Sequence, residues 1–142
     1  MQEALRVDIT ALASWAGTAC FGLYLLGRWL SHGGPRRQPT RITAFPAALV
    51  FAHPILATGG LMLWITFMLT HRVLYAWCGF GVLSASAMLG FVMLTRWLPG
   101  QGGKHARGAE QHVPAWVAAM HGTAGLTAFA VVLIAATVAT RR

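Results

Sequence analysis

Four long stretches of this chain contain no Lys, Arg, Asp or Glu. They cover residues 9–27, 44–70, 73–95 and 113–140, and the shortest has 19 residues. An α-helix needs about 20 apolar residues to cross the hydrocarbon core of a bilayer. Because hydrocarbon offers no water to backbone N–H and C=O groups, helix is the conformation expected for such stretches. They also lack the polar stripe, repeating every 3.6 residues, of a helix on the surface of a soluble protein.

The charge balance excludes the common soluble classes. Only 10% of the residues are charged, whereas about 25% is typical of a soluble domain. The 11 basic residues outnumber three acidic ones, but they form short clusters between apolar stretches instead of the basic face of a nucleic-acid-binding protein. Cys20 and Cys78 are predicted to differ in depth by about 15 Å, too far for a disulfide. We therefore predict an all-α, four-helix transmembrane bundle, with residues 1–142 forming a single integral membrane domain that binds no nucleic acid.

The distribution of Lys and Arg predicts an orientation. The loops at 28–41 and 96–112 contain seven of these residues, and the termini with the turn at 71–72 contain four. Since cytoplasmic loops are enriched in Lys and Arg, we expect both loops to be cytoplasmic. Both termini then lie outside the bacterial cytoplasmic (inner) membrane. The first residues, Met-Gln-Glu, lack the basic region of a signal peptide, and the two Gly- and Pro-rich loops are predicted to form no folded domain.

The sequence repeats itself at an offset of 68 residues. At this offset Arg28-Trp29-Leu30 aligns with Arg96-Trp97-Leu98, Pro46 with Pro114, and His53 with His121. Matches of Ala19, Gly22 and Leu26 to Ala87, Gly90 and Leu94 carry less weight, because these residue types are abundant here. The pattern predicts two tandem two-helix repeats with the same orientation. The alternative is chance, combined with the usual placement of Trp and Arg at membrane interfaces.

Two histidines lie within the predicted spans. His53 and His121 each follow a proline by seven residues. Because proline favours the first turn of a helix, each imidazole is expected about 10 Å below its helix start. The repeat makes the second and fourth helices parallel, so both imidazoles share one depth. Small residues follow each histidine at four and seven positions and predict a slot for a flat macrocycle: Ala57, Gly60, Gly125 and Ala128.

This arrangement resembles b-type cytochrome membrane subunits, in which histidines on parallel helices of a four-helix bundle bind haem. The resemblance covers the second and fourth helices, and it implies that His53 and His121 are the axial ligands of one haem b per chain. Subunits with two haems have a second histidine on each ligand helix, but the position equivalent to His71 is Ala139. The resemblance therefore does not extend to a second haem. The chain also resembles small four-helix membrane proteins of bacteria.

The ends of the first and third helices offer charges for the haem propionates. Arg28 and Arg96 are the candidates, and interfacial anchoring is the alternative role for them. Two histidines are too few for a zinc or copper site, which needs three or four ligands.

The sequence thus predicts an electron-transfer subunit, or an anchor of a larger membrane complex, more readily than a stand-alone enzyme. Its expected partners are the lipid bilayer and either a membrane redox complex or further copies of itself, and a quinone is a candidate. Two alternatives stay open. One is an accessory membrane subunit or small transporter whose histidines only link helices, and the other is a protein that binds haem transiently.

Overall fold

The computed structural model describes residues 2–36, 45–98 and 108–141 of the 142-residue chain. This part of the chain forms four long helices and a short 3-10 helix before the last of them: α1 Gln2–Ser31, α2 Ala47–Thr70, α3 Val73–Trp97, η3 Ala109–His112 and α4 Ala115–Thr140. Each of the four α-helices is long and apolar enough to cross a bilayer. The predicted all-α, four-helix transmembrane bundle is confirmed.

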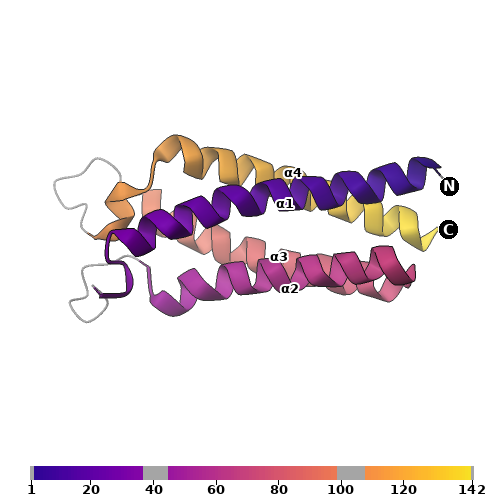
Figure 1. Cartoon of the computed structure of the whole chain (residues 1–142), viewed down its shortest axis with the longest axis horizontal. Helices are drawn as coiled ribbons and strands as arrows, with labels where there is room; N and C mark the ends of the chain where they lie inside the picture. The colour runs from indigo at the N-terminus through magenta and orange to yellow at the C-terminus, as the bar shows by residue number, and fades with distance from the viewer. Residues whose placement is uncertain (1, 37–44, 99–107, 142) are drawn as a thin grey trace.

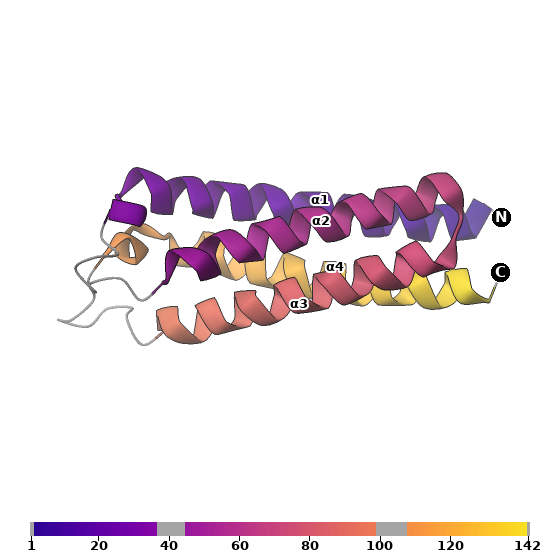
Figure 2. The same cartoon turned by 90° about the horizontal axis from the view of Figure 1, so that it is seen from below.

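The four helices lie along one common axis, with α1 beside α4 and α2 beside α3 (Figure 1). Contacts of α1 with α2 and of α3 with α4 close the bundle, so α2 and α4 are diagonal neighbours. Both termini and the tight α2–α3 turn lie at one end, here called the terminal end (Figure 2). The opposite end, here called the loop end, contains η3. Helices α2 and α4 both start at the loop end and run parallel, as the repeat predicted.

The helix ends are set by individual residues near them and do not coincide with the ends of the uncharged stretches. Helix α1 begins at Gln2, before the first uncharged stretch, with Glu3 in its first turn, where a carboxylate interacts favourably with the helix dipole. Pro46 and Pro114 precede the first residues of α2 and α4. Helix α2 ends at Thr70, and the next residue, His71, caps it with a left-handed φ of 55° and an N–H that donates to Phe67 O at 2.7 Å.

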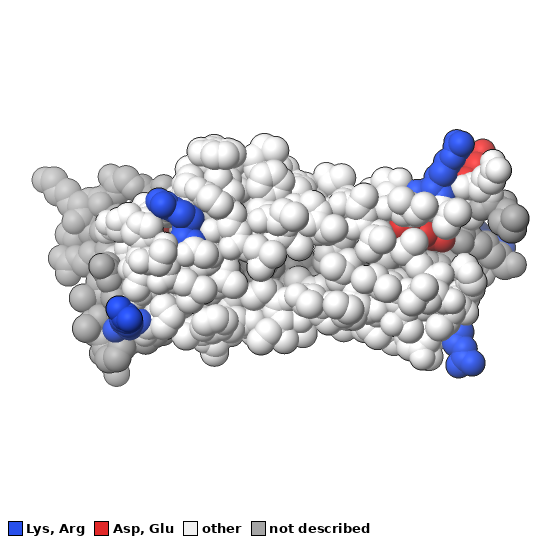
Figure 3. Space-filling view, viewed as in Figure 1, with Lys and Arg blue, Asp and Glu red and all other residues white. Residues whose placement is uncertain are grey.

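Charged side chains gather near the two ends of the bundle. On the face shown in Figure 3, Lys, Arg, Asp and Glu lie at the ends, and the middle of the molecule is uncharged. Large apolar side chains point outward along the same length, including Leu23, Leu69, Phe91 and Leu126, each at least 64% exposed. An apolar surface of this extent is unfavourable in water. It suits an integral membrane protein, with lipid as its solvent.

The buried core consists of two separate clusters. The cluster towards the terminal end centres on Trp15 and Trp64, and the cluster at the loop end centres on Trp29 and Trp97. The two loop-end tryptophans are 2% and 8% exposed, so they pack inside the bundle and do not face lipid as interfacial tryptophans do. Between the clusters lies the level of the two membrane histidines.

Helix η3 explains the burial of the loop-end tryptophans. Glu110 is 5% exposed, and its Oε1 accepts hydrogen bonds from Trp29 Nε1 at 3.4 Å and from the Phe45 N–H at 3.3 Å. The backbone carbonyl of Glu110 accepts a bond from Trp97 Nε1 at 3.3 Å. A buried indole N–H needs such an acceptor, and η3 supplies acceptors to both repeats. The end of the loop therefore packs as part of the bundle.

Two adjacent glycines of α2 provide a test of this packing. A Cβ atom at Gly60 would lie 2.9 Å from the Trp15 ring and 3.3 Å from Gly79 O, whereas a Cβ at Gly59 would meet nothing within 4 Å. Overpacking of this kind costs about 1–3 kcal/mol. Gly60→Ala should lower the free energy of unfolding by that amount, measured by SDS titration in mixed micelles. Gly59→Ala is the matched control and should stay within about 0.5 kcal/mol of wild type; equal effects would contradict the α1–α2–α3 packing.

Candidate functional site

The imidazoles of His53 and His121 meet inside the bundle. Their ring centroids are 6.0 Å apart, and the ring planes cross at 82°. The two side chains come from the diagonal helices α2 and α4, and both are half-buried. The two rings therefore lie at one depth, between the two core clusters.

Each imidazole is hydrogen-bonded to the backbone of an adjacent helix. His53 Nδ1 lies 2.8 Å from Ser86 O of α3, and His121 Nδ1 lies 3.1 Å from Thr18 O of α1. Because a carbonyl oxygen can only accept, Nδ1 must carry the proton in both rings. In a neutral imidazole this leaves a lone pair on Nε2. Within the described ranges of the chain, neither Nε2 has a hydrogen-bond partner.

Ser86 holds His53 through a second contact. Its hydroxyl donates to His53 O at 2.9 Å, and the same oxygen lies 3.2 Å from His53 Nδ1. Ser86 is 2% exposed. Its side chain and its carbonyl together connect α3 to α2 at the level of the rings.

The contacts of the two histidines are related by the 68-residue offset. Thr18 and Ser86 correspond at this offset, and so do Gly22 and Gly90. A Cβ at Gly22 would lie 3.0 Å from His121 Cε1, and a Cβ at Gly90 would lie 3.0 Å from His53 Cε1. Each histidine thus packs against the first helix of the other repeat. The glycine matches, which had little weight in the sequence, mark positions where an added Cβ would press on the ring.

The centroid spacing of 6.0 Å is that of an ordinary edge-to-face ring contact, and two imidazoles bound to one metal ion would have a similar spacing. A metal–imidazole bond is about 2 Å long and a ring centroid lies about 1 Å behind its nitrogen, giving centroids about 6 Å apart. A carbonyl on Nδ1 is also the usual outer partner of a metal-bound histidine. The described residues contain no group of three or more His, Cys, Asp and Glu side chains able to hold a metal. Haem iron fits this donor set, because the porphyrin supplies four ligands and the protein only the axial ones.

The predicted slot residues do not all surround the rings. Gly125 lies next to Thr18, with its added Cβ 3.7 Å from Thr18 Cγ2, but Gly60 packs against Trp15. Ala128 is 1% exposed and belongs to the core cluster at the terminal end, and Ala57 is half-buried on α2. The space expected beside Gly60 is filled by Trp15. The glycines in contact with the rings are Gly22 and Gly90.

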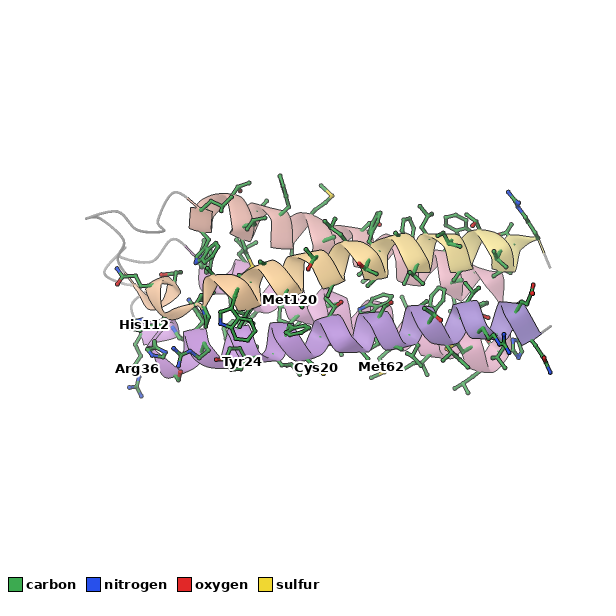
Figure 4. All side chains as sticks on the ribbon, turned by 90° about the horizontal axis from the view of Figure 1, so that it is seen from above. Cys20, Tyr24, Arg36, Met62, His112 and Met120 are labelled. Atoms are coloured by element: carbon green, nitrogen blue, oxygen red, sulfur yellow. The ribbon has the colours of Figure 1, made fainter. Side chains whose placement is uncertain are left out.

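The two candidate arginines lie on the loop-end side of the rings. Arg28 donates through Nε and Nη2 to His112 O, at 3.3 and 3.2 Å, and Arg96 is exposed in the last turn of α3. The six residues from Gly22 to Arg28 correspond to about 9 Å along the helix. His112 lies at the loop end with Arg36 (Figure 4) and stacks on His32 at 4.0 Å. His71 is exposed at the opposite end of the bundle, far from the ring pair.

Comparisons of the chain with protein-family models, curated proteins and solved structures find no match. Any functional inference therefore depends on the residues and geometry of this chain. The histidine pair is the feature that combines free donor atoms, fixed orientation and a place between the two cores.

The hydrogen bonds predict the tautomers of the histidines. His53 and His121 should both carry their proton on Nδ1, because Ser86 O and Thr18 O accept from that atom. Exposed His71, without such a carbonyl, is the internal control and should favour the Nε2–H form of free imidazole. The measurement is ¹⁵N NMR of histidine-labelled protein free of metal and haem, at a pH where the imidazoles are neutral. Protonated Nε2 in either membrane histidine would contradict the assignment.

Proposed function

We propose that this integral membrane protein is a b-type haem protein in which His53 and His121 are the two axial ligands of one haem. The single observation that supports this most is the ring pair, with centroids 6.0 Å apart and Nδ1 of each ring bound to a carbonyl. One proton fixed on Nδ1 makes Nε2 the donor atom in both rings. An axial ligand of haem iron must present an unprotonated nitrogen, and each imidazole with its proton on Nδ1 does so through Nε2.

A purely structural role explains less of the geometry. A histidine that only links helices needs one hydrogen bond, and Nδ1 already makes it. The Nε2 atoms of His53 and His121 have no hydrogen-bond partner within the described residues. A role in linking helices does not explain why both rings lie at one level of the membrane. An unsatisfied polar atom in a low-dielectric interior is costly. One metal ion bound by both rings would satisfy both Nε2 atoms at once.

Haem would supply one-electron chemistry. The residues of this chain would hold and orient the axial nitrogens and shield them from water. Arg28 and Arg96, on the loop-end side, would bind the propionates, because guanidinium groups recognise carboxylates with paired hydrogen bonds; Arg28 would then exchange its bonds to His112 O for bonds to a propionate. A chain with one such site would serve as an electron-transfer subunit or anchor of a membrane redox complex. With the loops cytoplasmic, the haem would lie nearer the inner leaflet.

Histidine substitutions test this proposal. Protein purified from haem-replete cells should contain about one haem per chain, measured by pyridine haemochrome assay. His53→Ala and His121→Ala should each lower the haem content at least tenfold, because an open axial position no longer holds the iron. His71→Ala is the matched control at the turn and should retain full haem content.

Three results would count against the haem proposal as stated. A colourless wild-type protein from haem-replete cells would favour an accessory subunit with structural histidines. Equal loss of haem in all three variants would show that the ligand assignment is wrong. Substoichiometric haem that an apo-acceptor removes would indicate the transient haem carrier instead.

A further inference from the structure

A second pair of imidazoles, His32 and His112, stacks face to face at the loop end. The ring centroids are 4.0 Å apart, and the ring planes differ by 19°. His32 directly follows α1, and His112 is the last residue of η3. The stack therefore joins the end of α1 to η3, and the function proposed above makes no use of it.

Arg28 holds both members of this stack. Its backbone carbonyl lies 2.7 Å from His32 Nδ1. Because a carbonyl oxygen can only accept, this Nδ1 carries a proton, and Nε2 is the atom of His32 that can take up a second one. The guanidinium group of Arg28 donates through Nε and Nη2 to His112 O, at 3.3 and 3.2 Å.

The helix that the stack holds covers the core cluster at the loop end. Ala109 of η3 is fully buried in that cluster. Glu110, the next residue, accepts hydrogen bonds from Trp29 Nε1 through its carboxylate and from Trp97 Nε1 through its carbonyl. A displacement of η3 would therefore remove the acceptors of both indoles and expose the two rings.

The loop end has little negative charge to compensate for protons on the stacked rings. Two of the three acidic residues of the chain, Glu3 and Asp8, lie in the first two turns of α1, at the terminal end. The third is Glu110, whose carboxylate accepts from Trp29 Nε1 and from the Phe45 N–H. Helices α2 and α4 contain no Asp, Glu, Lys or Arg. The other charged side chains that the structure describes at this end are cationic: Arg28, Arg36 and Arg96 (Figure 4).

The charge of the two rings decides whether the stack is stable. Neutral rings can stack, and one proton is tolerated because a cation is attracted to the face of an aromatic ring. A second proton places two like charges about 4 Å apart, and their repulsion favours separation of the rings. Histidine side chains change charge between about pH 8 and pH 5. Both rings are therefore cationic only at the acidic end of this range.

We propose that the stack of His32 on His112 is an acid-sensitive switch, which holds η3 against the end of α1 at neutral pH and releases it below about pH 6. The released form binds more protons than the closed form, so the free energy that keeps η3 in place falls as the pH falls. Release separates Glu110 from Trp29 and Trp97. The switch needs only contacts at the loop end, and it does not depend on the haem proposal.

Fluorine NMR of protein labelled with 5-fluorotryptophan tests this switch in detergent micelles. The six tryptophan signals are assigned with single Trp→Phe variants, and a water-soluble gadolinium chelate broadens the signals of indoles that water reaches. The protein is kept reduced, so that any bound low-spin haem is diamagnetic. Between about pH 7.5 and about pH 5, the broadening of the Trp29 and Trp97 signals should increase at least threefold. Trp15 and Trp64, in the core cluster at the terminal end, are internal controls and should not change.

Two variants that keep a ring at each position assign the effect to the pair. His112→Phe and His32→Phe each leave one ring that can be charged, and each should lower the acid-induced broadening at least threefold, because one imidazolium on a phenyl face is attractive. His71→Phe removes the exposed histidine at the opposite end and, as the matched control, should respond to acid like wild type.

Three outcomes would overturn the switch. The first is wild-type protein whose Trp29 and Trp97 signals do not respond to acid. The second is an equal acid response in all three histidine variants, which would assign the effect to another titrating group. The third is an equal response of Trp15 and Trp64, which would indicate that acid unfolds the whole bundle.

Discussion

An imidazole N–H placed in a lipid bilayer needs an acceptor from the protein, since no water is present to take its place. In this chain the acceptors are two backbone carbonyls, Ser86 O for His53 and Thr18 O for His121. Each bond joins the second helix of one repeat to the first helix of the other, which matches the α2–α3 and α1–α4 pairing of the fold. The same bonds fix the proton on Nδ1 and thereby determine which nitrogen is left for a ligand.

Packing on both sides protects this polar layer. Trp15 and Trp64 fill the bundle towards the terminal end, and Trp29 with Trp97 close the loop end under Glu110. Gly22 and Gly90 bring the helix backbones close to the imidazoles. The centre of the membrane domain is thus a thin polar level between two apolar cores, which is the environment in which a bound metal group would be shielded from water.

Much of this architecture was predictable from the sequence. The absence of charges marks the four helices, and the offset of 68 residues places His53 and His121 on parallel helices at one depth. The acceptors of the histidines were not predictable, because any residue has a carbonyl and only the helix pairing decides which one is near. The prediction of a slot beside Gly60 is wrong for a similar reason. The spacing of small residues along α2 does not reveal that Trp15 of α1 fills this space. Burial of Trp29 and Trp97 depends on η3, which hydropathy alone assigns to a polar loop.

The two repeats share the histidine contacts and differ around them. Trp64 corresponds to Val132, Trp15 to Leu83, and Thr58 to Leu126, so the common centre has unlike flanks.

The claim that two imidazoles share one iron is tested most directly by electron paramagnetic resonance of the oxidised, purified protein at low temperature. Because the ring planes cross at 82°, we expect one low-spin ferric signal of the strongly anisotropic type given by nearly perpendicular axial imidazoles. A high-spin ferric signal would mean that at most one histidine binds the iron. That result, or a protein without haem iron, would contradict the account.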